Sequence, residues 1–309
     1  MAQTFLTTAI QAGNFEDLVN FIYRVSYDQA PFLNAIGTVQ AKAIKHEWMT
    51  QVLRAAISNA QAEGFTPTFN TQTTSQTGGA GVSRPRVRRS NQVQIIADTI
   101  TASFTQEFVD KAGLGEGSEY EAQKDLRILE ITKDADRALL LSTVVVRDAD
   151  AGTASQMDGA LAWATGALTV AAGSVALSQD LYESLSRVIW QTSGETADTV
   201  VCSGYQRRQI STWTTNFKRH EMKDMTMTDT IEVYRGDWGS QTVLPDPHMT
   251  DTSLLICRKD YLKKAYLRPI AHKELGQTID GRRGYVVTEV TLEARNPNTV
   301  ASFTGLASA

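Results

Sequence analysis

The segment from Thr66 to Gln92, TPTFNTQTTSQTGGAGVSRPRVRRSNQ, most constrains what this chain can fold into. It is 27 residues long, contains no acidic residue, and has only three large apolar side chains, those of Phe69, Val82 and Val87. A stretch of that length without secondary structure is uncommon inside a compact domain. This one also has too few apolar residues to bury itself. The fold must therefore let the segment project from the body of the protein.

The two flanks of this segment are predicted to be strands. Residues 43–57 favour a strand in their first half, and residues 93–104 are rich in β-branched side chains. If these flanks pair, residues 43–104 form a long two-stranded excursion. Residues 66–92 are then its tip.

A long helix is predicted over residues 117–148. Glu119 and Glu121 lie in its first turns, where negative charge suits the helix dipole. A helix of about 30 residues spans roughly 45 Å, so it would act as a strut. Its apolar stripe consists of Leu126, Leu129, Ala135, Ala138 and Leu139.

Residues 159–261 alternate between helix and strand patterns. Ser178 and Ser203 are predicted to cap two helices, over residues 179–192 and 204–214. A hairpin is expected over residues 230–245, where GDWG forms the turn.

Near the end of the chain, residues 284–295 alternate apolar and polar side chains. We expect a closing strand there that pairs with the early strands. The whole order of elements predicts an α+β fold.

The sequence contains no complete motif of a known class of enzyme site. The sequence HEWMT at His46 begins like a zinc-protease motif, but Thr50 stands where the second histidine should be. Cys202 and Cys257 lie in apolar runs and are predicted to be buried. No catalytic, cofactor-binding or metal-binding residue is predicted, and no cofactor is expected. An enzyme that uses Cys202 or His46 remains a competing class.

Charge and hydropathy narrow the function classes further. The net charge of -4 argues against a strongly basic nucleic-acid binder, although it leaves room for a local basic patch. No window approaches 18 apolar residues, and the N-terminus lacks the pattern of a signal peptide. No contact with a membrane is therefore expected.

Arg84, Arg86, Arg88 and Arg89 form a basic cluster at the end of the polar segment. These like charges repel one another unless something neutralises them. One candidate is an acidic patch on a neighbouring molecule, which would make the four arginines and Phe69 inter-subunit contacts. Nucleic acid is the other candidate, but the flanking stretch lacks interleaved aromatic residues.

Several stretches resemble one branch of the major capsid proteins of tailed bacteriophages, a branch long described only as a domain of unknown function. The resemblance runs in order through nearly the whole chain. Its stretches are NFEDLVNFIYRVSYDQAPFLNAIG, KHEWMTQVL, SNQVQIIADTITASFTQ, GDWG, AYLRP and VTLEARNP.

This resemblance implies the tailed-phage major capsid fold. That fold consists of an N-terminal arm, an extended loop, a peripheral domain with a long spine helix, and an axial domain. Gly113, Gly115 and Gly117 would form a hinge before the long helix. The implied parts are an N-terminal arm and short helix at 1–42, an extended β-hairpin loop at 43–104 with its tip at 66–92, a peripheral domain at 105–158 with a spine helix at 117–148, an axial domain at 159–261, and a return to the peripheral domain at 262–309 with the closing strand at 284–295.

The resemblance also implies a function. The chain would self-assemble into hexamers and pentamers that form an icosahedral head enclosing phage DNA, with DNA on the inner face held without sequence specificity. It would be part of the virion, assembled in the host cytoplasm. The alternative is a nucleic-acid-binding or other intracellular assembly protein that uses the basic loop Arg84–Arg89.

Two departures from relatives affect the expected partners. No lysine occurs from His46 through Asp110, so a lysine–asparagine crosslink from the extended loop is not expected. No long charged helical leader precedes the arm, so scaffolding would come from a separate protein. A portal and a cement or decoration protein are further partners that the resemblance allows.

Overall fold

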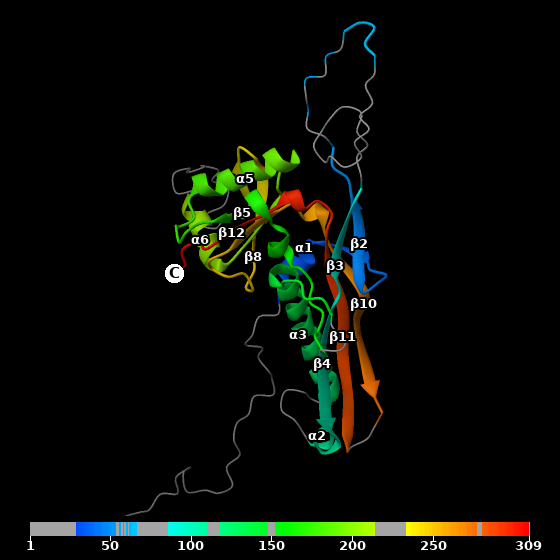
Figure 1. The fold of residues 1–309 in the computed structure, drawn as a ribbon. Coiled ribbons are helices and arrows are strands. Elements are labelled where there is room, and N and C mark those ends of the chain that lie inside the picture. Colours follow the sequence, from blue (N-terminus) through cyan, green and yellow to red (C-terminus); the bar gives the residue numbers. More distant parts are fainter. Residues whose placement is uncertain are drawn as a thin grey trace, which may run out of the picture.

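A computed structural model describes residues 29–53, 56, 58, 60, 62–66, 86–109, 118–147, 152–213, 233–276 and 280–308. Figure 1 shows an elongated part built on long strands, a more compact part at one end, and a hairpin that leads away from both. Among these residues, no helix is long and apolar enough to cross a membrane.

The elongated part contains a four-stranded sheet in the order β1-β10-β11-β4. Its strands are β1 (Gly37–Gln40), β10 (Leu262–Leu275), β11 (Gly281–Ala294) and β4 (Gln94–Ser103). β1 runs parallel to β10, while the β10–β11 and β11–β4 pairs are antiparallel. The predicted closing strand is confirmed as β11, and it pairs with an early strand as expected.

β10 is a 14-residue strand in a stretch for which no strand was predicted. Pro269 argues against a strand in this part of the sequence, because proline cannot donate a hydrogen bond to a sheet ladder. The structure resolves the conflict with register shifts on either side of Arg268, between Tyr266 and Ala271. The strand resumes after this irregularity.

The predicted long helix is α3 (Glu119–Leu141), which packs on β4 and β11. It is shorter than the predicted range because Ser142 already has an extended backbone. At its other end, the Glu107 carboxylate accepts hydrogen bonds from Ser118 Oγ and from the backbone N–H groups of Glu119 and Tyr120, each at 3.0 Å. Glu107 follows β4 in α2 (Phe104–Phe108) and satisfies N–H groups that the helix leaves without partners.

The predicted pairing of residues 43–57 with 93–104 is wrong. β2 (Lys45–Thr50) pairs instead with β3 (Val87–Gln92), which the sequence analysis placed in the tip. The sequence VRRSNQ of β3 is polar and gives no strand signal. Cross-strand contacts and side-chain bonds outweigh that composition, because strand preference depends strongly on context.

The compact part holds a six-stranded sheet in the order β5-β12-β9-β6-β8-β7. Its strands are β5 (Thr169–Ala171), β12 (Val300–Thr304), β9 (Leu254–Cys257), β6 (Thr199–Cys202), β8 (Gly239–Pro245) and β7 (Val233–Gly236). The predicted hairpin at 230–245 is confirmed as β7–β8.

Both predicted helix caps are confirmed in the compact part. Ser178 Oγ accepts from Leu181 N at the start of α5 (Gln179–Ser193), and Ser203 Oγ accepts from Gln206 N at the start of α6 (Gly204–Thr212). α5 ends at Gly194, whose φ of 71° lies in the left-handed region that glycine adopts at no steric cost.

The chain end does not stay with the first sheet, as the predicted return over residues 262–309 implied. β12 lies between β9 and β5 of the second sheet, and its apolar residues are buried. The remaining short helices are α1 (Pro31–Ala35) and α4 (Ala160–Trp163), with 3₁₀ turns at Gly166–Leu168, Lys259–Tyr261 and Pro297–Thr299.

A single core joins the two sheets. Val201 of β6 and Leu255 and Cys257 of β9 belong to the same buried cluster as Phe32 of α1 and Leu139 of α3. Their strand neighbours point to the opposite face of the sheet and pack with α5 and α6. The second sheet is therefore covered on both faces.

We expect Gly284→Ala to destabilise the fold by about 1–3 kcal/mol, as overpacking of a filled core does. An added Cβ would lie 1.9 Å from the Tyr120 hydroxyl, which is buried and bonded to His272 Nε2 at 2.7 Å. Gly276→Ala is the matched control, because its Cβ meets no atom within 4 Å. Urea unfolding measures both variants, and equal stabilities would contradict the prediction.

Candidate assembly interface

The β2–β3 hairpin leads away from the body toward the described residues 62–66 (Figure 1). Its strands are paired in register from Lys45 opposite Gln92 to Thr50 opposite Val87. His46, Trp48 and Asn91 bond to β11, whereas the bond described for the Thr50 side chain goes to Val87 of β3. The hairpin therefore has a supported base and a distal part.

Asn91 ties the base of β3 to two other segments. Its Nδ2 donates to the carbonyls of Leu292 at 2.8 Å and Asp158 at 3.0 Å, and its Oδ1 accepts from Asp158 N at 2.8 Å. Asn91 is buried, so each of these bonds satisfies a polar atom that water does not reach.

β2 is tied to the end of β11 by two further side chains. Trp48 Nε1 donates to the carbonyl of Ala294 at 3.0 Å, and His46 Nε2 lies 3.0 Å from Glu293 Oε2. Together with Asn91, these residues form what we call the hairpin base. Only 13% of the His46 side chain is exposed, so His46 lies within this base rather than on the surface.

Glu293 is the ionised partner in this base. Burial raises the pKa of its carboxyl, but hydrogen bonds from His46 and Arg295 outweigh that effect and hold the pKa below its usual range. The carboxylate therefore stays charged at neutral pH and bridges the hairpin to β11.

The distal part carries apolar side chains that the described residues leave uncovered. Leu53 is 86% exposed, Val52 66% and Met49 60%, and Phe65 and Val87 are also exposed. These five residues form the distal surface. Large exposed apolar side chains that gather in one part of a protein are typical of an interaction site.

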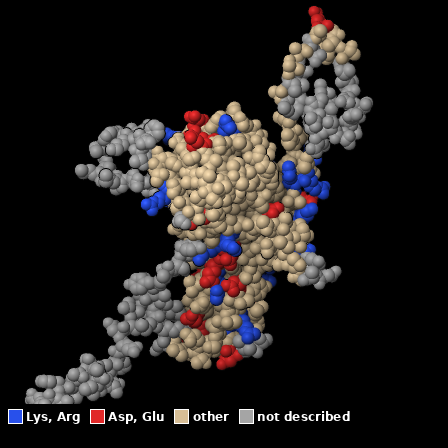
Figure 2. All heavy atoms as spheres, turned by 60° about the vertical axis from the view of Figure 1, so that its left-hand side comes forward, with Lys and Arg blue, Asp and Glu red and all other residues tan. Residues whose placement is uncertain are grey.

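The structure partly neutralises the predicted arginine cluster. Arg88 Nη1 lies 3.3 Å from Glu47 Oε2 on the paired strand, so the argument that no acid is nearby is wrong for this residue. Arg86 and Arg89 are exposed and pair with no acidic side chain among the residues described. Figure 2 shows Lys and Arg atoms gathered where the hairpin leaves the body.

Other predicted contact and hinge residues lie outside the described residues. They are Phe69 and Arg84 of the loop tip and Gly113, Gly115 and Gly117 of the hinge. The N-terminal arm before residue 29 lies outside them as well.

The two cysteines are buried, as predicted. Burial raises the pKa of the Cys202 thiol to about 12, so this side chain is a neutral thiol rather than a nucleophilic thiolate. With His46 committed to Glu293, neither residue of the competing enzyme class is poised for catalysis.

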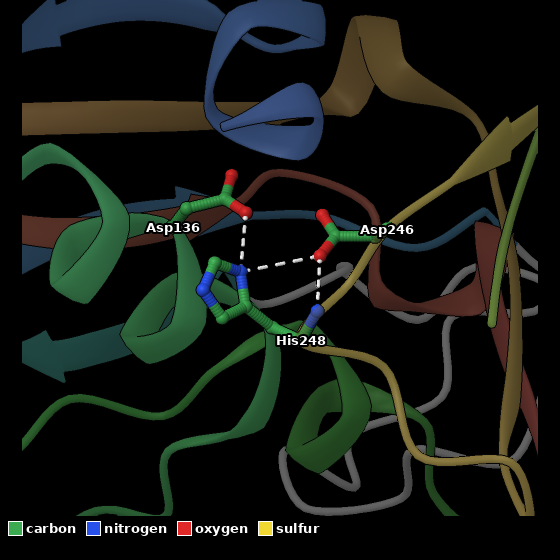
Figure 3. Close-up of side chains that lie close together, drawn as sticks. All are labelled: Asp136, Asp246 and His248. Carbon is green, nitrogen blue, oxygen red and sulfur yellow. Dashed lines mark hydrogen bonds and ion pairs between the residues drawn. The ribbon is translucent and has the colours of Figure 1, made fainter. Parts of the chain in front are cut away.

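A buried cluster that the sequence analysis missed joins α3 to the second sheet. His248 Nδ1 lies 3.1 Å from Asp136 Oδ2 and 3.2 Å from Asp246 Oδ1 (Figure 3). Burial and the neighbouring Asp246 carboxylate raise the pKa of Asp136 to about 8. No motif could have revealed the cluster, since Asp136 is about 110 residues from its partners.

Comparison with known proteins gives a family match. The family model described as SU10 major capsid protein matches residues 2–307. No curated protein matches the chain.

Solved structures share the fold at low sequence identity. A chain from Mycobacterium phage Bobi is 12% identical with a TM-score of 0.61, over 99% of this chain and all of that one. A capsid chain of an empty GTA particle is 13% identical with a TM-score of 0.62, over 98% of this chain and all of that one. The SrpI encapsulin of Synechococcus elongatus is 9% identical with a TM-score of 0.60, over 99% of this chain and 97% of that one.

We expect Glu293→Gln to lower the free energy of unfolding by about 1.5–3 kcal/mol at pH 7, the usual range for hydrogen bonds to a charged group. A depressed pKa in the folded state contributes stability above the unfolded pKa, which is about 4.3 for glutamate. This contribution disappears as pH falls through the lower folded value. The difference between variant and wild type, measured by urea unfolding, should therefore shrink as pH falls below the unfolded pKa of about 4.3.

Glu47→Gln is the control for this prediction. It removes two exposed ion pairs of the same hairpin, with Lys45 and Arg88, each of which should be worth less than about 1 kcal/mol. A Glu293→Gln effect no larger than the control, or one that does not change with pH, would contradict the role of Glu293.

Proposed function

Since the chain belongs to the SU10 major capsid protein family, we propose that it builds the icosahedral head of a tailed phage from hexamers and pentamers of identical subunits. It is a structural shell protein and not an enzyme. The head would enclose phage DNA, which would lie against the inner face without sequence specificity.

The hairpin is the observation that supports this assembly. Its base is fixed to β11 by buried hydrogen bonds, whereas its distal surface exposes Met49, Val52 and Leu53. A neighbouring subunit that covers this surface would remove apolar area from water, and that burial favours association. Because the base is already ordered, less conformational freedom is lost on binding.

The segment before β3, residues 66–86, would extend the same contact across the neighbouring subunit. The proposed contact residues are Phe69, Arg84 and Arg86 of this segment together with Arg88 and Arg89 of β3. Arg86 and Arg89 suit this role, because they are exposed charges that an acidic patch on the neighbour would neutralise.

Identical subunits would form closed rings through heterologous contacts. We place the predicted axial domain, residues 159–261 together with β12, around the ring axes, and the peripheral domain with α3 farther out. Gly113, Gly115 and Gly117 are the proposed hinge that adapts the subunit to hexamers and pentamers.

The proposed partners follow from the same role. A separate scaffolding protein, a portal and a cement or decoration protein would act during or after assembly in the host cytoplasm. The finished shell would be held by non-covalent contacts, because the lysine needed for a loop crosslink is missing between His46 and Asp110. The protein would be part of the virion, and we propose no contact with a membrane.

We expect Leu53→Asp to reduce the yield of assembled particles at least about tenfold while the subunit stays folded. A loss of about 1.4 kcal/mol per contact already changes an equilibrium constant tenfold, and a shell repeats the contact in every subunit. Leu53→Met keeps the surface apolar and is the matched control. Negative-stain electron microscopy and light scattering of the full chain measure the yield.

The wild-type chain should form shells, tubes or capsomer-sized rings, with added scaffolding protein if it requires one. Normal particles from Leu53→Asp would show that the distal surface is not the contact. A wild-type chain that stays monomeric even with scaffolding protein would contradict the proposed assembly.

A further inference from the structure

Asp136, Asp246 and His248 converge where α3 meets the second sheet (Figure 3). Asp136 lies on α3, while Asp246 and His248 follow the end of β8. One donor atom from each residue lies within 4.8 Å of the other two. Three side chains from two separate segments therefore form one compact set of oxygen and nitrogen donors.

The set holds two buried carboxylates that share one imidazole. Asp136 and Asp246 are 0% and 1% exposed, and the ion pairs described for both are to His248 alone. Lys264 is a further cation near Asp136, but its Nζ donates to the carbonyl of Leu33 at 2.8 Å rather than to a carboxylate. Two carboxylates buried this close together repel each other unless a proton or a cation joins them.

One oxygen in the set lacks a hydrogen-bond donor. Asp246 Oδ1 accepts from the backbone N–H of His248 at 2.8 Å, whereas Asp246 Oδ2 is buried without a partner among the described residues. Both oxygens lie on the side of Asp246 that faces Asp136 and His248 (Figure 3). A buried carboxylate oxygen in this state calls for a proton or a cation.

The spacing of the donor atoms fits coordination of one ion. Zinc lies about 2.0–2.2 Å from nitrogen and oxygen ligands, so two ligands at tetrahedral or octahedral angles are about 3.0–3.5 Å apart. The distances from His248 Nδ1 to Asp136 and Asp246 are 3.1 and 3.2 Å. Two of the three ligand–ligand distances therefore match those around one ion, and the third is within 4.8 Å.

We propose that Asp136, Asp246 and His248 bind one divalent transition-metal ion, with Zn²⁺ the best match. An imidazole nitrogen suits zinc better than magnesium or calcium, which prefer oxygen ligands alone. Three protein ligands leave a further position for water.

The ion would connect α3 of the elongated part with the β8–β9 connection of the compact part. Asp136 is also held by Leu33, whose N–H donates to Oδ1 at 2.6 Å, so α1 would support the same site. The metal would lock the relative placement of the two sheets. This inference concerns the folded subunit and does not depend on the proposed assembly.

The test uses the full chain, freed of metal by a chelator and titrated with ZnCl₂ in a calorimeter. We expect one equivalent to bind with micromolar or tighter affinity and to raise the melting temperature by roughly 5 °C or more at saturation. Mg²⁺ and Ca²⁺ should bind at least about tenfold more weakly.

Asp246→Asn separates a metal site from a shared proton. The amide keeps the shape of the carboxylate and can donate to Asp136, so the variant should fold but bind Zn²⁺ at least about tenfold more weakly. Asp251→Asn is the matched control, because Asp251 is exposed in the same connection. It should bind like wild type.

Three results would overturn the proposal. One is a wild-type chain that binds no stoichiometric Zn²⁺, which together with a more stable Asp246→Asn variant would indicate a shared proton. Another is equal Zn²⁺ stabilisation of both variants, which would indicate adventitious surface binding. If Asp246→Asn does not fold, visible absorbance of Co²⁺ in the wild-type chain decides, because an absence of one-equivalent saturation would also reject the site.

Discussion

Burial of β11 is the constraint on which the rest of the structure depends. Val286, Val290 and Leu292 are 0% exposed, and the strand has ladder partners on both edges, β10 and β4. α3 packs on the same strand. The carbonyls of Leu292 and Ala294 also accept the side-chain bonds that hold the hairpin. Sheet, helix and hairpin are thus positioned by one 14-residue segment.

This arrangement explains how a chain can expose apolar side chains at a defined place. The hairpin base uses short, buried hydrogen bonds, so the direction in which the hairpin leaves the body is set before any partner arrives. A partner would meet Met49 on a strand that the base already positions, with Val52 and Leu53 shortly after it, which lowers the entropy cost of association.

The sequence predicted elements whose signals are local. The capped helices after Ser178 and Ser203, the β7–β8 hairpin and β11 have caps, turn residues or alternation within their own segments. β3 was missed because its stability comes from β2 and from Asn91, not from its polar residues. The position of β12 in the second sheet was missed because it depends on pairing with β5 and β9, which are distant in sequence.

The candidate site was predicted unevenly for the same physical reason. That residues 66–92 project from the body stays a prediction from their low apolar content, because residues 67–85 lie outside the described residues and residues 87–92 form β3. The exposed residues Met49, Val52 and Leu53 were not identified, because their exposure depends on how the hairpin packs on β11 and not on local sequence. The cluster around Asp136 depends on contacts between distant segments and has no local signal at all.

The way the parts are joined also limits where the subunit can adapt to different curvatures. Val201 and Leu255 of the second sheet share a core with α1 and α3, so bending between the sheets would open buried apolar surface. Glu107 ties α2 to the start of α3, so freedom at the proposed glycine hinge between them would leave α3 in place on the sheet. Adaptation to hexamers and pentamers would therefore fall on the segments that join or extend these parts, the proposed glycine hinge and the loop beyond the hairpin base, while the body keeps its shape.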